Sequence, residues 1–124
     1  MKVLIVDDDI SVRSLFREFF KMKGFEVLEA QDGHEAMRKL HETEPDLIIL
    51  DMKMGRMSGL EVLEKIRELF PHIPVIVCTA YKHLRMDVDL VSLGKAYFLT
   101  KPVDFTELNK LLIEIFPMMA LNIT

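Results

Sequence analysis

The sequence holds a single cysteine, few glycines and prolines, and no long apolar run. Because Cys78 has no second cysteine to pair with, an internal disulfide is excluded. A membrane-spanning helix needs ~20 consecutive apolar residues, and no stretch of the chain approaches that length. The opening apolar segment is interrupted at Asp7 and is too short for a signal peptide. We therefore expect a cytoplasmic protein that does not insert into a membrane.

Positive charge is also scarce, with 16 lysines and arginines against 20 aspartates and glutamates and a formal net charge of −4. No basic run of the kind that follows a phosphate backbone is present, so direct nucleic-acid binding is disfavoured. No internal repeat, low-complexity tract or flexible linker divides the 124 residues. The sequence predicts one domain over residues 1–124, with a core over about 2–116 and an apolar tail over 117–124.

Five short apolar segments alternate with stretches of helical periodicity, which is typical of a parallel sheet with crossover helices. The expected strands are Val3–Val6, Phe25–Ala30, Leu47–Leu50, Val75–Cys78 and Ala96–Leu99. The expected helices are Ser11–Lys23, Gly33–Glu42, Ser58–Phe70, Leu84–Leu93 and Phe105–Phe116. The second strand alternates with glutamates, as an edge strand can, whereas the first, third and fourth are apolar throughout. The pattern predicts an α/β protein of five βα units.

Polar residues follow four of these strands, at the edge where an open parallel sheet carries its functional crevice. They are Asp7, Asp8 and Asp9 after the first strand, Asp51 after the third, Thr79 after the fourth and Lys101 after the fifth. Carboxylates crowded there repel one another by roughly 4 kcal/mol per pair at 4 Å and an effective dielectric of about 20. Mg²⁺ would relieve this repulsion by binding Asp8 and Asp51, with Asp7 acting through water. For Asp9 we expect helix capping instead.

Asp51 is the residue best placed to react, because a carboxylate at the end of an apolar strand is costly unless it is paired or metal-bound. A carboxylate can attack phosphorus and form an aspartyl phosphate, provided that charge is neutralised nearby. Lys101 would supply positive charge, and the Thr79 hydroxyl would donate to a phosphoryl oxygen. A turn-forming role for Thr79 and helix capping by Asp7 and Asp8 are the simpler alternatives.

Four motifs in this order resemble the receiver domain of bacterial response regulators over about Lys2–Phe116. The motifs are Ile5-Val6-Asp7-Asp8, the segment Asp46–Met54 around Asp51, Thr79-Ala80 and Lys101-Pro102. The resemblance implies a doubly wound, flavodoxin-like (βα)5 fold with strand order 2-1-3-4-5. It also implies a stand-alone signalling protein of a two-component system or phosphorelay rather than an enzyme. This protein would take its phosphoryl group from a phosphohistidine of a sensor histidine kinase. It would then signal to, or pass phosphate to, a downstream phosphotransfer or output protein.

The resemblance assigns roles to individual residues. It makes Asp51 the phosphoacceptor and places Mg²⁺, for which we expect Mn²⁺ to substitute, on Asp7, Asp8, Asp51 and the main-chain carbonyl of Lys53. Lys101 would bind the phosphoryl group, and Thr79 would act as a switch with the aromatic Phe98, whose lack of a hydroxyl predicts an inward rotamer. The surface of the fourth helix, fifth strand and fifth helix would change on phosphorylation.

Partner contacts are expected on the first helix, which carries more apolar residues than one stripe can bury. The resemblance places the kinase helices there, with Val12 and Leu15 as contacts and ordinary core packing as the alternative. Tyr97 would offer an aromatic side chain to a partner. Lys53 and Tyr81 flank the site without a water-orienting amide or carboxylate, which predicts slow autodephosphorylation.

The sequence departs from the family at Gly55, where a proline is usual, and at Ser58, where an aspartate is usual. Ser58 still suits the N-cap of the third helix. The alternatives to a receiver are a phosphatase or mutase with an aspartyl-phosphate intermediate, an FMN-binding module, and a receiver-like scaffold that takes no phosphate. A phosphatase or mutase would need a second acid where this chain has Lys53, and an FMN-binding module would need a phosphate-binding loop that this chain lacks. The scaffold is disfavoured because the acceptor residues are present.

Overall fold

The computed structural model describes residues 1–54, 58–80, 94 and 96–122. Five parallel strands form one sheet in the order β2-β1-β3-β4-β5, as the family resemblance implied. The strands are β1 (Lys2–Val6), β2 (Glu26–Ala30), β3 (Leu47–Asp51), β4 (Val75–Thr79) and β5 (Ala96–Thr100). Each expected strand is confirmed to within one residue at either end.

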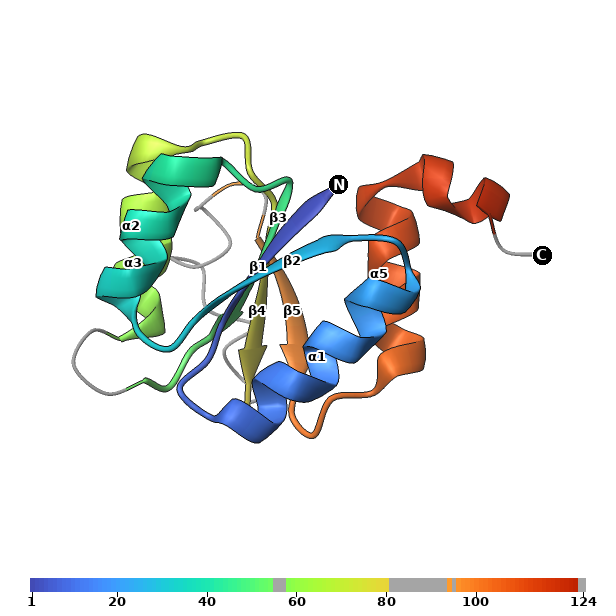
Figure 1. Cartoon of the computed structure of the whole chain (residues 1–124), viewed down its shortest axis with the longest axis horizontal. Helices are drawn as coiled ribbons and strands as arrows, with labels where there is room; N and C mark the ends of the chain where they lie inside the picture. The colour runs from blue at the N-terminus through green and yellow to red at the C-terminus, as the bar shows by residue number, and fades with distance from the viewer. Residues whose placement is uncertain (55–57, 81–93, 95, 123–124) are drawn as a thin grey trace.

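Helices cover both faces of the sheet (Figure 1). The helices are α1 (Ile10–Met22), α2 (Gly33–Thr43), α3 (Gly59–Leu69), α5 (Phe105–Ile115) and the 3-10 helix η2 (Pro117–Asn122). Helices α1 and α5 lie on one face, and α2 and α3 lie on the other. The helix expected over 84–93, Gly55 and Tyr81 lie outside the described residues.

The helix starts follow from local side-chain chemistry. Asp9 caps α1 by accepting a hydrogen bond from the Ser11 N–H at 2.8 Å, as the sequence predicted. Ser58 and Asp104 cap α3 and α5 in the same way. The first strand thus ends three residues before a fixed helix start, and Asp7 and Asp8 are held in the short connection between them.

Alternation along the strands decides which face each side chain enters. Val3 and Ile5 pack with α1 and α5, whereas Leu4 and Val6 pack with α2 and α3. The central strands β1, β3 and β4 are almost wholly buried, and β2 is the partly exposed edge that its glutamates predicted. The polar residues at the strand ends continue this alternation.

None of the described helices is both long enough and apolar enough to span a membrane. The two methionines at the start of the apolar tail have different environments. Met119 contacts the α1/α5 core and donates its N–H to the Phe116 carbonyl, but Met118 is 73% exposed. Successive residues of the 3-10 helix η2 point about 120° apart, so these neighbouring side chains meet different surroundings.

Candidate functional site

Three carboxylates meet at the carboxyl ends of β1 and β3. Asp7, Asp8 and Asp51 each offer an oxygen, and these oxygens lie within 4.8 Å of one another. Asp7 and Asp51 are buried, with exposed fractions of 2% and 4%, whereas Asp8 is exposed. The sequence prediction that these acids converge is therefore confirmed, and Asp8 gives the cluster its open side.

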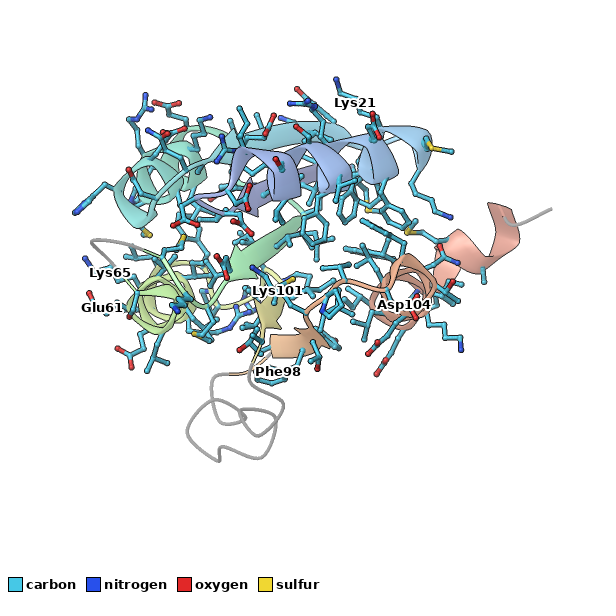
Figure 2. The ribbon with its side chains drawn as sticks, turned by 90° about the horizontal axis from the view of Figure 1, so that it is seen from below. Lys21, Glu61, Lys65, Phe98, Lys101 and Asp104 are labelled. Carbon is cyan, nitrogen blue, oxygen red and sulfur yellow. The ribbon has the colours of Figure 1, made fainter. Side chains whose placement is uncertain are left out.

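Lys101 brings a positive charge to the buried pair. Its Nζ atom lies 3.1 Å from Asp51 Oδ1 and 3.6 Å from Asp7 Oδ2. Figure 2 shows Lys101 near the middle of the molecule, close to the ends of β4 and β5. With three ionised carboxylates and one ammonium group, the cluster keeps a net charge of −2, which matches a divalent cation.

Main-chain groups fix the two buried acids. Asp7 Oδ1 accepts a hydrogen bond from the Asp9 N–H at 2.9 Å, and Asp51 Oδ1 accepts one from the Lys53 N–H at 3.2 Å. Gly59 starts α3 so close to β3 that an added Cβ would lie 2.5 Å from the Asp51 carbonyl oxygen. The absence of a side chain at Gly59 therefore allows the helix to approach the strand end that carries Asp51.

Burial and neighbouring charges shift the pKa values of Asp7 and Lys101. Burial raises the pKa of Asp7, and the neighbouring Asp51 and Asp8 add to this effect, although the Asp9 N–H and Lys101 oppose it. Burial alone would lower the pKa of Lys101, but its hydrogen bond to Asp51 and the charge of Asp7 outweigh burial and raise it. The cluster thus keeps its ammonium charge and holds one carboxylate that is costly to ionise.

The donor set fits a small hard cation. All three side chains offer carboxylate oxygens, which Mg²⁺ prefers, and an ion with several waters suits a site that is open on the Asp8 side. A cation would also oppose the rise in the Asp7 pKa that burial causes, because it would stabilise the ionised form. Within the described part of the chain this is the acidic group suited to a metal ion.

Thr79 ends β4, the strand next to the one that carries Asp51, and Phe98 lies on β5. Thr79 is 2% exposed at the end of β4, and its carbonyl accepts a hydrogen bond from the Lys101 N–H at 2.8 Å. Phe98 is half-buried and packs against the α2/α3 core. Figure 2 shows it at the outer edge of β5, away from Lys101.

The predicted partner residues have different environments. Leu15 is 55% exposed and Ile10 is 67% exposed on α1, so part of this helix is apolar and accessible. Val12 is half-buried against the α1/α5 core, which favours core packing for that residue. Tyr97 is likewise half-buried against this core.

Three features of the site were not predicted from the sequence. They are the contact between Arg13 and the Asp7 carbonyl at 2.6 Å, the close approach at Gly59, and the position of Cys78 opposite Asp51 in the sheet register. Arg13 carried a usable signal, because a cation near the start of a helix opposes the helix dipole and needs an acidic or carbonyl partner. Burial raises the pKa of the Cys78 thiol to about 12.

Comparisons with known proteins agree with this geometry. The response regulator receiver domain family matches residues 3–113. The chain is 36% identical over 108 residues to sporulation initiation phosphotransferase F of Bacillus subtilis, covering 87% of each protein. It is 40% identical over 103 residues to the chemotaxis protein CheY of Listeria monocytogenes, covering 82% of this chain and 87% of the relative.

A solved structure supports the same assignment. Response regulator protein TrrA from Thermotoga maritima, in complex with Mg(2+)-BeF, superimposes with a TM-score of 0.83 and 33% identity, over 93% of this chain and 98% of the other. Other curated relatives are longer, and the chain spans 25% of their length. The acid cluster, the strand order and these likenesses place the chain in the response regulator receiver domain family.

Proposed function

We propose that this protein receives a phosphoryl group on Asp51 from a phosphohistidine of a sensor histidine kinase, in a Mg²⁺-dependent reaction. The observation that carries the proposal is the position of Asp51, a buried carboxylate that contacts the Lys101 ammonium and lies beside the acids Asp7 and Asp8. Receiver domains are phosphoacceptors of two-component signalling, and the family assignment therefore supports this chemistry.

The transfer needs one bond exchange. An oxygen of Asp51 forms a bond to phosphorus while the bond between phosphorus and the donor histidine nitrogen breaks, and the electron pair of that bond returns to the imidazole ring. Lys101 lies 3.1 Å from Asp51, and its ammonium group would pair with the negatively charged oxygens of the transferred phosphoryl group. The Thr79 hydroxyl would donate a further hydrogen bond to the phosphoryl group.

Asp7, Asp8, Asp51 and the Lys53 carbonyl would hold Mg²⁺, and Mn²⁺ would substitute for it. When bound, the ion neutralises charge on the carboxylates and on the incoming phosphoryl oxygens. Asp7 is already oriented by the Asp9 N–H, and the Lys53 N–H fixes Asp51, so the chain orders these ligands before the ion arrives. The Mg(2+)-BeF complex of TrrA supports such a site in this family.

Phosphorylation would act on the rest of the molecule through Thr79 and Phe98. Thr79 would move toward the phosphoryl group, and Phe98, which is half-buried, would turn into the space that Thr79 leaves. The surface around β5 and α5 would then signal to an output protein or phosphotransfer protein, together with the fourth helix that the sequence predicts.

The kinase would dock on α1, beside the acid cluster. The exposed Leu15 supplies apolar contact area there beside the exposed Ile10, with Val12 as a further contact. Tyr97, on β5, would offer its aromatic side chain to a partner. The chain would work in the cytoplasm as a single domain over residues 1–124, and it would act as a signalling protein rather than an enzyme. We also propose slow autodephosphorylation, because Lys53 carries no group that orients water. A phosphoryl half-life of seconds in Mg²⁺ buffer would contradict this last point.

Intact-mass measurement after incubation with acetyl phosphate tests the proposal. We expect wild type to gain one phosphoryl group in Mg²⁺ and none in EDTA, and Asp51→Asn to gain none in either condition. Asp104→Asn is the matched control, since asparagine caps helix α5 as well as aspartate does and the site is untouched. Continued turnover of a phosphate ester, or equal labelling of Asp51→Asn, would refute the proposal.

A further inference from the structure

Arg13 connects helix α1 to the backbone of the acid cluster. Its Nη1 atom donates a hydrogen bond to the Asp7 carbonyl oxygen at 2.6 Å, and its Nε atom donates to Glu29 Oε1 at 3.3 Å. The Arg13 side chain is 13% exposed, so these contacts are largely shielded from solvent. The neighbouring Arg17 pairs with the same glutamate, with 3.0 Å between Arg17 Nη1 and Glu29 Oε2, and no described contact joins it to Asp7.

The Arg13 contact completes the fixation of Asp7. The Asp7 N–H donates to the Ala30 carbonyl at 3.1 Å, and Asp7 Oδ1 accepts from the Asp9 N–H. With Arg13 on its carbonyl oxygen, Asp7 is held at both of its peptide groups and at its side chain. The peptide that Arg13 contacts joins Asp7 to Asp8, so the same bond orients two residues of the cluster.

We propose that Arg13 is a positioning residue for the cation site, with Glu29 as the acid that offsets its charge. The inference rests on the proposed Mg²⁺ site and adds a residue outside the ligand set. Groups that orient metal ligands contribute to affinity because a ligand that is already oriented loses less freedom when the ion binds.

Charge and geometry act in opposite directions here, so the sign of the effect is informative. The positive charge of Arg13 alone would repel a cation, and its removal would then tighten binding. Glu29 lies against both Arg13 and Arg17, and it offsets much of that repulsion. The 2.6 Å bond to the Asp7 carbonyl is direct, so its loss outweighs the loss of a partly neutralised charge.

Calorimetric titration with Mg²⁺, without any phosphodonor, measures the effect. We expect Arg13→Met to raise the Mg²⁺ dissociation constant about fivefold, which corresponds to about 1 kcal/mol at 25 °C. Arg17→Met is the matched control, because it removes a cation from the same glutamate without touching Asp7, and its dissociation constant should stay within about twofold of wild type. Thermal melts of each variant record any general loss of stability.

A second readout separates positioning from a merely structural role. The initial rate of labelling by acetyl phosphate should fall for Arg13→Met at low Mg²⁺ and return to the wild-type rate at saturating Mg²⁺, whereas a distorted site would stay slow. If Arg13→Met does not fold, Glu29→Gln takes its place, since an uncompensated Arg13 should also weaken Mg²⁺ binding. Wild type that binds no Mg²⁺ would refute the proposed function, whereas Mg²⁺ binding unchanged or tighter in Arg13→Met refutes this inference alone.

Discussion

Replacing Asp7 by asparagine should stabilise the protein without Mg²⁺ and remove the stabilisation that Mg²⁺ provides. Asn retains an oxygen that can accept the hydrogen bond from the Asp9 N–H, so the substitution changes mainly the charge. Asp7 is 2% exposed, and burial is the largest cause of its raised pKa. The buried negative charge of Asp7 therefore lowers the stability of the folded protein when no cation is bound.

The magnitude follows from two opposing charge interactions. Asp51 and Asp8 both repel Asp7, and at an effective dielectric of about 20 a pair at the 4.8 Å limit of the cluster costs about 3.5 kcal/mol, whereas attraction to the Lys101 ammonium at 3.6 Å is about 4.5 kcal/mol. Water screens the repulsion from the exposed Asp8, and Lys101 is partly exposed as well, so the charge terms offset one another in part and the burial of the charge decides the sign. We expect Asp7→Asn to gain on the order of 1 kcal/mol, or about 3–5 °C in melting temperature, in EDTA.

Mg²⁺ should reverse the order of the two proteins. At a hundredfold excess over its dissociation constant, a bound ion stabilises wild type by ~2.7 kcal/mol, and Asp7→Asn should gain much less. Differential scanning fluorimetry in EDTA and in Mg²⁺ measures both values, with Asp9→Asn as a control that keeps the helix cap. A melting temperature of Asp7→Asn below that of wild type in EDTA would show that the Asp7 charge does not destabilise the folded protein.

The pH dependence has a definite sign. Because the folded pKa of Asp7 lies above the unfolded value of 3.8, the folded state holds its proton more tightly than the unfolded state. Wild type therefore loses this contribution to stability as the pH rises from below 3.8 through the folded pKa. The advantage of Asp7→Asn in EDTA should be absent at the low end of this range and grow as the pH rises.

Other substitutions test the parts of the site separately. Gly59→Ala should destabilise the chain by about 1–3 kcal/mol in urea unfolding and slow the labelling of Asp51, because the new Cβ would meet the β3 backbone at 2.5 Å. As a control, Gly24→Ala changes a glycine with a positive φ of 86° far from the site, and it should lower stability without slowing labelling. Lys101→Met should lower the rate of labelling by acetyl phosphate at least about tenfold, since the phosphoryl charge would lack its ammonium partner, and an unchanged rate would exclude this role. Cys78, 1% exposed and with its pKa raised to about 12, should react with thiol reagents at pH 8 only when the chain unfolds; rapid labelling of the native chain would show that β4 opens at this end.

Much of the fold could be predicted because its signals are local. Four apolar residues before Asp51 predict a buried strand, and Asp9 and Ser58 predict the helix starts that the structure shows. The convergence of the acids also followed, since the carboxyl ends of parallel strands meet at one edge of a sheet. Alternation along the strands then places Asp7 and Asp51 on the same face.

The remaining features depend on how the helices are rotated and how closely they pack. Arg13 reaches the Asp7 carbonyl only because α1 turns that side chain toward β2, and the residue pattern alone allowed it to face solvent. For the same reason Val12 enters the core whereas Leu15, one turn later, is exposed. Gly59 shows its importance only when α3 lies against β3.

The position of the phosphoryl group is the most direct test of the central claim. Wild-type protein is incubated with acetyl phosphate in Mg²⁺, reduced with borohydride to convert an acyl phosphate to a stable alcohol, digested and sequenced by tandem mass spectrometry. We expect Asp51 alone to be converted to homoserine, and only in samples that contained Mg²⁺. Conversion at Asp7 or Asp8, or equal conversion of Asp51 in EDTA, would contradict that claim.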